Sequence, residues 1–359
     1  IFKPSKLFLP VQLIIKKFLI IFFFLNLVFL TNNTYSTPKP EKDYGIISIM
    51  YHRFDENKYP STNIKLSDFQ EHIKIIQENK IEFINANKFE ESLRNSKNKR
   101  KVLLTVDDAF FSFYKNAWPI LKKNKIPFIL FVSTREVGKY NYMTWEQIKE
   151  ISKENFVHIG NHSHSHEYLI DKSKDEIYED INNSISILKN EIGYNSEFFS
   201  YPFGEYSLEF KKIVKDLNFK YAFGQHSGVI DETKDLLELP RFPINEKYGE
   251  KKRFKFLLKT LPFKYKQIFP KEKYLNKTSN PPKVIVHFDK NEKNIDLINC
   301  YSNELNVWGK SNIILIDENK IEIELKGKFI TERGRINCSL QSDNGFWKWL
   351  GMQFVIAEN

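Results

Sequence analysis

The sequence predicts an α/β protein made of parallel βαβ units and followed by a small β-rich module. Short apolar runs alternate with amphipathic helical patterns between residues 46 and 262, which is the signature of βαβ units. The chain then turns polar and lysine-rich as far as Pro282, which indicates a domain boundary. Beyond it, apolar and charged residues alternate one by one, as in Ile321 to Lys326, and this is typical of half-buried antiparallel strands.

Length and charge narrow the class of protein. With 359 residues the chain is long enough for one large domain and a small one. The net charge of +10 comes from 55 basic and 45 acidic residues that are spread along the whole chain. Because no lysine- and arginine-rich block is interleaved with aromatic residues, a nucleic-acid partner is not expected.

Residues 1–36 are predicted to be a targeting segment. Lysines precede an apolar run from Phe18 to Leu30 and small residues follow it, as in a secretory signal peptide. As a helix this run spans about 20 Å, which is shorter than the ~30 Å hydrocarbon core of a membrane. We therefore expect an exported protein, periplasmic or extracellular. An apolar stretch counted from Leu7 makes an uncleaved membrane anchor the alternative, and residues 37–45 are predicted to be a linker.

The apolar runs between residues 46 and 262 are predicted strands, with helices between them. Strands are expected over residues 45–51, 81–84, 102–108, 127–133, 156–160, 198–201, 221–223 and 237–242. Helices are expected over residues 69–79, 113–123, 174–191 and 208–217, and Thr144 is expected to cap one more helix.

Two adjacent carboxylates end the run from Val102 to Asp108, which is otherwise apolar and rich in valine and leucine. Such a run suits a parallel strand buried on both faces, so Asp107 and Asp108 are expected at its C-terminal mouth. Open α/β sheets and α/β barrels place their active sites there. Because side chains alternate along a strand, one carboxylate is expected to bind a metal ion and the other to act as a base. The alternative is that an aspartate caps a helix that starts at Ala109.

Three histidines at alternate positions, His162, His164 and His166, follow the predicted strand at 156–160. A single histidine is usually structural, but such a cluster at a strand end favours metal binding. Histidine together with carboxylate suits a borderline cation such as zinc, and a catalytic site uses three protein ligands and keeps one position open. His162, His166 and one of the two aspartates supply that set.

Three motifs, in this order, resemble those of the polysaccharide deacetylases, carbohydrate esterase family 4. Thr105 to Ala109 resembles the family's Thr-Phe-Asp-Asp-Gly motif, and Asn161 to His166 resembles its Asn-His-(Ser/Thr)-x-x-His motif. Tyr201 to Gly204 resembles its third, proline-containing motif. The resemblance extends over Ile46 to Pro262. It implies a distorted (β/α) barrel of about seven strands and metal-dependent removal of N-acetyl groups from sugars.

Carried over by position, the family's roles fall on particular residues of this sequence. Asp107 is implied as the base, while Asp108, His162 and His166 are implied as the ligands of one divalent ion. Zinc is the expected ion, with cobalt or nickel as alternatives. The third motif is implied to line the site and to hold the oxyanion through its backbone, although it also reads as an ordinary turn. Its residues are Tyr201, Pro202, Phe203 and Gly204.

Two positions depart from the family's pattern. Ala109 stands in place of the usual glycine, and Ser200 stands where many members have an arginine that orients the base. Arg241, at the end of a late predicted strand, either takes over the role of that arginine or is a surface cation.

The general acid is expected at the start of the barrel. Many family members carry a Leu-x-x-His motif near the end of the domain, and none follows Arg241 here. The first strand instead ends at His52, in an arrangement that resembles the permuted deacetylases of exported poly-N-acetylglucosamine. We predict His52 as the acid, with an ordinary pKa near ~6.5. His226, which also follows a short strand, is the competitor, and a purely structural histidine is the remaining alternative for His52.

The predicted organisation ends with a linker at residues 263–283 and a small β-rich accessory domain at residues 284–359. Its tryptophans are either a stacking platform for carbohydrate or, as is commoner, part of a core or interface. They are Trp308, Trp347 and Trp349.

Cys300 and Cys338 are the only cysteines of the chain. In an exported protein an even count favours a disulfide, with two buried free thiols as the alternative. The bridge would lie within the accessory domain.

These features predict a hydrolase that removes N-acetyl groups from an N-acetylhexosamine-containing polysaccharide. Metal-activated water would attack the amide, with an Asp base and a His acid. The first alternative is an O-acetyl esterase acting on an acetylated glycan. The second is a non-catalytic carbohydrate-binding protein that retains the fold.

Overall fold

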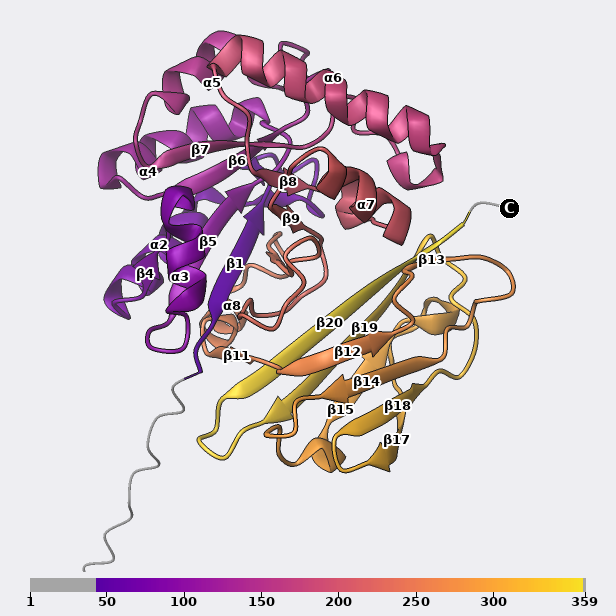
Figure 1. Cartoon of the computed structure of the whole chain (residues 1–359). Coiled ribbons are helices and arrows are strands. Elements are labelled where there is room, and N and C mark those ends of the chain that lie inside the picture. Colours follow the sequence, from indigo (N-terminus) through magenta and orange to yellow (C-terminus); the bar gives the residue numbers. More distant parts are fainter. Residues whose placement is uncertain (1–42, 358–359) are drawn as a thin grey trace, which may run out of the picture. The chain divides into compact units, whose positions relative to one another are not determined.

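The computed structural model describes residues 43–357 (Figure 1). The predicted signal peptide or anchor at residues 1–36, and the predicted linker as far as residue 42, lie outside these residues. Within residues 43–357 no helix is both long enough and apolar enough to span a membrane. The described chain contains one large sheet with helices around it and, from residue 260 onward, two smaller sheets.

Parallel strands form the large sheet in the order β10-β1-β5-β6-β7-β8-β9, and β4 pairs with the start of β5. A backbone bridge between Phe223 and Leu239 joins β9 to the segment that leads into β10, so the sheet closes on itself. The predicted fold class, a distorted (β/α) barrel of about seven strands with a C-terminal β domain, is confirmed. The strands are β1 (Ile46–Tyr51), β4 (Glu82–Phe83), β5 (Lys101–Val106), β6 (Phe128–Val132), β7 (Val157–Asn161), β8 (Phe198–Ser200), β9 (Tyr221–Phe223) and β10 (Phe242–Pro243), with a separate pair β2 (Arg53–Phe54) and β3 (Asn63–Ile64).

Helices surround the barrel strands (Figure 1), and two of them begin where sequence signals place them. A capping box of Thr144 and Gln147 starts α5, and a second one of Ser173 and Glu176 starts α6. Gly193, at a φ of 85°, ends α6 in the left-handed conformation that glycine adopts most readily. The helices are α2 (Leu66–Glu78), α3 (Phe89–Arg94), α4 (Trp118–Asn124), α5 (Trp145–Ser152), α6 (Lys174–Ile192), α7 (Leu208–Asp216) and α8 (Lys251–Leu257). Shorter turns are η1 (Ala86–Lys88), η2 (Phe113–Ala117), η3 (Leu169–Asp171), η4 (Pro202–Gly204), η5 (Ile295–Leu297) and η6 (Glu304–Asn306).

The barrel strands are apolar because both of their faces are covered. Every residue of β1 and of β5 is buried, and so is every residue of β6. Such strands leave no room for charge along their length, so the carboxylates and imidazoles that follow them gather at the carboxyl ends.

Two smaller sheets make up the accessory domain. One has the order β11-β20-β19-β15-β16 with β13 also on β20, and the other has the order β12-β14-β18-β17. All pairs are antiparallel except those that β11 and β13 make with β20. The strands are β11 (Thr260–Pro262), β12 (Tyr265–Phe269), β13 (Tyr274–Leu275), β14 (Val284–Phe288), β15 (Asn299–Ser302), β16 (Gly309–Lys310), β17 (Asn312–Asp317), β18 (Lys320–Glu324), β19 (Arg333–Gln341) and β20 (Trp347–Ile356).

Residues 263–283, which the sequence presents as a linker, differ from that expectation. They contain β12 and β13, which pair with strands of the accessory sheets. No residue of β12 is fully buried, so its sequence carries lysine and glutamine and lacks the apolar pattern of a core strand. The accessory sheets therefore begin at β11, before the predicted boundary.

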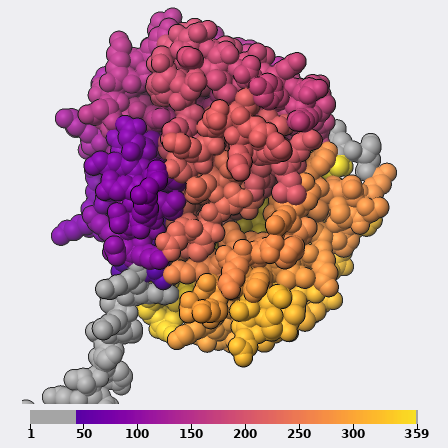
Figure 2. Space-filling model, in the orientation of Figure 1, coloured from indigo at the N-terminus to yellow at the C-terminus, as the bar shows by residue number. Residues whose placement is uncertain are grey.

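The accessory domain packs directly on the barrel. In Figure 2 its orange and yellow surface adjoins the pink surface of the later barrel elements, and a backbone bridge joins Gly228 to Leu350 of β20. A Cβ on Gly351 would lie 2.4 Å from the carbonyl oxygen of Ser227, so the two backbones meet where only glycine fits. The accessory sheet thus reaches the loop that follows β9.

Candidate active site

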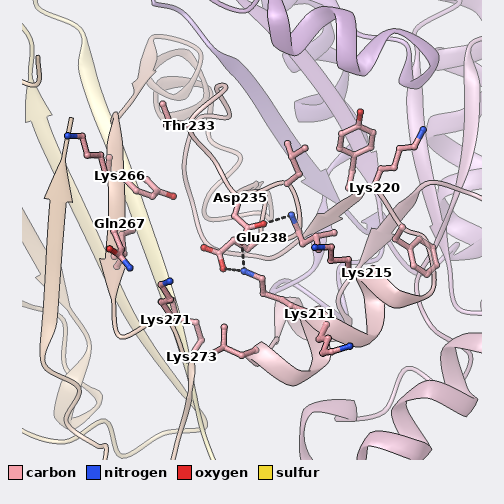
Figure 3. A pocket seen from close by; sticks show the side chains of 18 of the residues that line it. Lys211, Lys215, Lys220, Thr233, Asp235, Glu238, Lys266, Gln267, Lys271 and Lys273 are labelled. Carbon is pink, nitrogen blue, oxygen red and sulfur yellow. Dashed lines mark hydrogen bonds and ion pairs between the residues drawn. The ribbon is translucent and has the colours of Figure 1, made fainter. Parts of the chain in front are cut away.

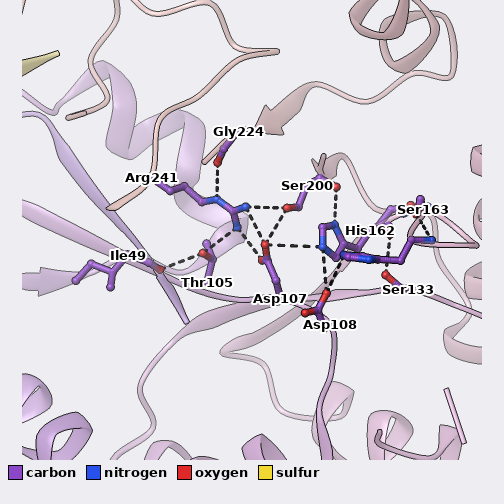
Figure 4. A network of polar contacts seen from close by, with 12 residues as sticks. Ile49, Thr105, Asp107, Asp108, Ser133, His162, Ser163, Ser200, Gly224 and Arg241 are labelled. Atoms are coloured by element: carbon purple, nitrogen blue, oxygen red, sulfur yellow. Dashed lines mark hydrogen bonds and ion pairs between the residues drawn. The ribbon is translucent and has the colours of Figure 1, made fainter. Parts of the chain in front are cut away.

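The two aspartates after β5 point to different partners (Figure 4). Asp107 pairs with Arg241 and its Oδ2 lies 3.9 Å from Nε2 of His162, whereas Asp108 lies closer to His162 and also faces His166. Asp108 takes a positive φ of 74°, which turns the chain sharply between the two carboxylates. The next helical turn is not capped by a side chain, so the alternative of a helix N-cap is not what the structure shows. The two carboxylates therefore have different surroundings, as their different expected roles require.

Asp108, His162 and His166 form a group that fits a metal ion. Their ligand atoms all lie within 4.8 Å of one another. Oδ1 of Asp108 is 3.3 Å from Nε2 of His162 and 3.2 Å from Nε2 of His166. This oxygen is buried and has no hydrogen-bond partner among the described residues, which is unusual for a carboxylate unless an ion completes the site. One carboxylate and two imidazoles are a donor set that zinc accepts, with room for water at a fourth position.

Neighbouring groups fix the orientation of these ligands. Nδ1 of the buried His162 donates a hydrogen bond to the carbonyl oxygen of Ser200 at 2.6 Å, which fixes the ring with Nε2 directed at Asp108. The ring of His166 packs on Phe203, with 4.7 Å between the centroids. Nδ1 of His164 instead contacts Oγ1 of Thr134 at 2.8 Å, so this histidine belongs to a different contact.

Arg241 lies fully buried against Asp107. Its Nη1 and Nη2 donate to the two carboxylate oxygens at 2.7 and 2.8 Å, a bidentate pair. Nη2 also donates to Oγ of Ser200 at 2.8 Å, and Ser200 donates to Asp107 at 3.1 Å. Nε donates to the carbonyl oxygen of Gly224 at 3.0 Å. Many family members have an arginine at the position of Ser200, and here Arg241 from the end of the barrel contacts Asp107 instead. Arg241 is fully buried, so it is not a surface cation.

This arrangement keeps Asp107 ionised. Burial alone would raise the pKa of Asp107, but the positive charge and hydrogen bonds of Arg241 lower it below its ordinary value. The pKa of Asp108 is also lowered despite burial, because His162 and His166 face it. Both groups are therefore carboxylates at neutral pH, as a base and a metal ligand must be.

Both candidate acids, His52 and His226, line one cavity together with Asp108 and His166. Nδ1 of each is buried without a hydrogen-bond partner among the described residues. Burial lowers the pKa of His52, with the nearby aspartates opposing it, so the ordinary pKa expected from the sequence is not found. The pKa of His226 is lowered to about 3, by burial and by the charges of lysines around it.

The third motif, in η4 after β8, offers one candidate donor for an oxyanion. The N–H groups of Tyr201 and Gly204 already donate to the carbonyl oxygens of Phe223 and Tyr201. Pro202 has no N–H group, so among the four predicted residues Phe203 remains. Phe203 lines the cavity, at a φ of 57°.

The cavity in front of the ligands has a volume of about 780 Å³ and receives side chains from both domains. The accessory domain contributes Trp308 and Trp349, as well as Arg333 and Arg335 of β19. Sequence reasoning did not single out the two arginines. The alternation Arg-Gly-Arg-Ile-Asn-Cys-Ser-Leu at the start of β19 is the signal that marks one polar face.

A larger cavity of about 1050 Å³ lies away from this site, between α7 and β12 (Figure 3). It is rich in lysines, of which Lys211 pairs with Asp235 and Glu238. None of the predicted site residues lines it.

Comparison with known proteins agrees with the geometry. The family model "Polysaccharide deacetylase" matches residues 94–222, which include both aspartates, the histidine ligands and the third motif. Residues 94–222 are thus identified as a polysaccharide deacetylase domain, and over this stretch the chain is similar to the hydrolases of that family. A curated relative, the poly-beta-1,6-N-acetyl-D-glucosamine N-deacetylase of Staphylococcus aureus, is 25% identical over 198 residues, a match covering 51% of this chain and 68% of the relative.

Solved structures show the same fold. IcaB from Ammonifex degensii superimposes with a TM-score of 0.53 at 24% identity, covering 58% of this chain and 94% of that one. The Streptococcus pyogenes deacetylase PplD, in complex with acetate, gives a TM-score of 0.53 at 24% identity, covering 56% of this chain and 93% of that one.

Proposed function

We propose that the protein is a metal-dependent hydrolase that removes N-acetyl groups from an N-acetylglucosamine polymer. The observation that carries the proposal is the convergence, at one barrel mouth, of a metal-binding set and a separately buried carboxylate–arginine pair. The named activity of the Staphylococcus aureus relative, poly-β-1,6-N-acetylglucosamine deacetylation, supports this substrate.

Asp108, His162 and His166 would hold the ion, zinc first and cobalt or nickel as alternatives. A divalent ion at such a site polarises a carbonyl oxygen and lowers the pKa of water. Asp107 accepts the proton of the attacking water, and Arg241 keeps this carboxylate ionised and oriented. The N–H of Phe203 faces the charge that develops on the acetyl oxygen.

The amine leaves only after it is protonated, and we assign that proton to His52. His52 lines the cavity directly with Asp108, and both aspartates favour its charged form. His226 lies among lysines, and its pKa of about 3 leaves it without a second proton at neutral pH. An acid with so low a pKa is a poor match to turnover near neutrality.

The disulfide that the structure forms between Cys300 and Cys338 supports an exported protein, because such bonds persist in oxidising compartments. We therefore place its action on polysaccharide of the cell envelope, periplasmic or extracellular.

The test is acetate release from a panel of acetylated glycans, with and without a chelator. The panel comprises poly-β-1,6-N-acetylglucosamine, chitin oligomers and acetylated xylan. Chelator-sensitive release from the amide substrates is expected. Release from acetylated xylan alone would make the protein an O-acetyl esterase, and no release from any substrate would favour a non-catalytic carbohydrate-binding protein.

A further inference from the structure

β19 of the accessory domain presents a polar face to the active-site cavity. Its residues alternate between two environments, as in any strand. Ile336, Cys338 and Leu340 are buried in the core between the accessory sheets. The side chains on the opposite face of β19 line the cavity that Asp108 and His166 also line. They are Arg333, Arg335, Asn337 and Ser339.

Aromatic side chains extend this face. Tyr301 of β15 lies opposite Asn337, and Trp349 of β20 lies opposite Ser339. Trp308 lies just before β16, which pairs with β15. Tyr301 is 47% exposed and Trp308 49% exposed, although both are large apolar side chains, and all three aromatic residues line the cavity.

Side-chain contacts fix the position of this face relative to the loop that carries the third motif. Nε of Arg333 donates to Oε1 of Glu205 at 2.6 Å, directly after the third motif. Its guanidinium lies over the ring of Phe203, 5.3 Å from the centroid. Nε2 of Gln353 donates to the carbonyl oxygens of Phe203 and Gly204 at 3.3 and 3.4 Å. The accessory sheet is therefore a fixed wall of the cleft that touches the proposed oxyanion residue.

Positive charge dominates this cleft. Among the residues that line it, Asp108 is the one carboxylate, against three arginines. Arg333 is paired with Glu205. Arg253 and Arg335 form no ion pair with a carboxylate anywhere in residues 43–357, so their charges are available to a ligand.

Resting on the function proposed above, we infer that the accessory domain forms a binding site for the neighbouring sugar and selects a neighbour that is still acetylated. Tyr301 and Trp308 offer flat apolar surfaces for a sugar ring. Arg335 offers donors for the oxygen of an acetamide. A deacetylated neighbour carries an ammonium group, which the charges of Arg335 and Arg253 repel.

The test uses β-1,6-linked trisaccharides whose central acetyl group carries a ¹³C label. One substrate has acetylated neighbours on both sides, and two others carry a free amine on one side or the other. Labelled acetate is measured to give kcat/KM for each. We expect wild-type protein to prefer the fully acetylated substrate over one of the amine isomers by about 5- to 20-fold, as expected for screened like charges.

The variants separate this site from the catalytic centre. Arg335→Gln, alone or with Arg253→Gln, should bring the preference towards unity while retaining the metal. Trp308→Ala should raise KM for all three substrates and leave kcat nearly unchanged. Lys215→Gln, which removes an exposed charge on α7, is the matched control and should change neither value. Raising the pH until the amine is neutral should abolish the preference of the wild type.

Two results are decisive and distinct. Equal kcat/KM on all three substrates, or a preference that survives in the Arg253→Gln, Arg335→Gln double variant, would overturn the inference and leave the proposed function standing. Absence of labelled acetate from the fully acetylated substrate, with wild-type protein and metal, would overturn both.

Discussion

Replacing Arg241 with glutamine isolates the role of the buried pair at the base. The change removes two charge-assisted hydrogen bonds to Asp107 and those to Ser200 and Gly224. Asp107 is then a buried carboxylate without its counter-ion, and breaking such a pair costs roughly 3–5 kcal/mol. A typical domain has about 5–15 kcal/mol of stability, so the variant should fold but unfold at markedly lower denaturant concentration.

Three companion variants test the energetic cost of breaking the Asp107–Arg241 pair. Asp107→Asn alone should also destabilise the protein, because it leaves a buried guanidinium without a partner, and it should lower turnover by about 10²-fold or more. The double variant Asp107→Asn, Arg241→Gln should be more stable than the sum of the single changes predicts, by about 2 kcal/mol or more, since neither charge is left unpaired. Ser200→Ala should cost only about 1 kcal/mol.

Urea unfolding, acetate release and metal content are measured for each protein. Arg241→Gln should retain its metal, because Arg241 touches none of the three ligands, and should lose most of its turnover. Additive stabilities in the double variant, or full turnover in Arg241→Gln, would refute the role assigned to the pair.

Three further predictions concern the acid, an interdomain pair and the disulfide. His52→Ala should lower turnover of an amide far more than of an activated acetyl ester, whose leaving group needs little protonation; if His226→Ala alone does this, the acid is misassigned. Burial raises the pKa of Glu205 to about 7 from an ordinary 4.5, so the folded protein binds this proton more tightly than the unfolded chain. Wild-type stability should therefore fall as pH rises from about 4.5 to about 7, and Glu205→Gln should remove that part of the slope; an identical slope in both proteins would contradict it. Replacing Cys300 and Cys338 by alanine should destabilise the accessory sheets by up to about 4 kcal/mol on the chain-entropy model, measured by urea unfolding; unchanged stability would argue against a structural role of the bond.

Local pattern predicted that two histidines and one of the two aspartates form a metal site, and the resemblance to the deacetylases pointed to Asp108; these three residues do lie together in the structure. An apolar run that ends at Asp107 and Asp108 has few alternatives to a buried parallel strand with its functional end at the carboxyl side. His162 and His166 follow the strand two places further along the sheet, so closure of the barrel brings them to Asp108. The histidine that ends β1 reaches the same cavity for the same reason.

Contacts between distant segments were harder to predict. The contact of Arg241 with Asp107 depends on which strand ends meet when the barrel closes, and the sequence left it open between two roles. β12 escaped notice because an exposed edge strand lacks apolar periodicity. Arg335 lines the cavity because the accessory sheet packs against the mouth of the barrel, and no local sequence pattern encodes that packing.

Asp108, His162 and His166 are proposed to hold the ion on which deacetylation depends. The most direct test strips the protein of metal and follows acetate release from poly-β-1,6-N-acetylglucosamine as zinc is added back. Activity should be absent at first, rise with zinc and level off at about one ion per chain, and His162→Ala should neither bind the ion nor recover. Full activity in the metal-free protein, or in His162→Ala, would contradict the claim.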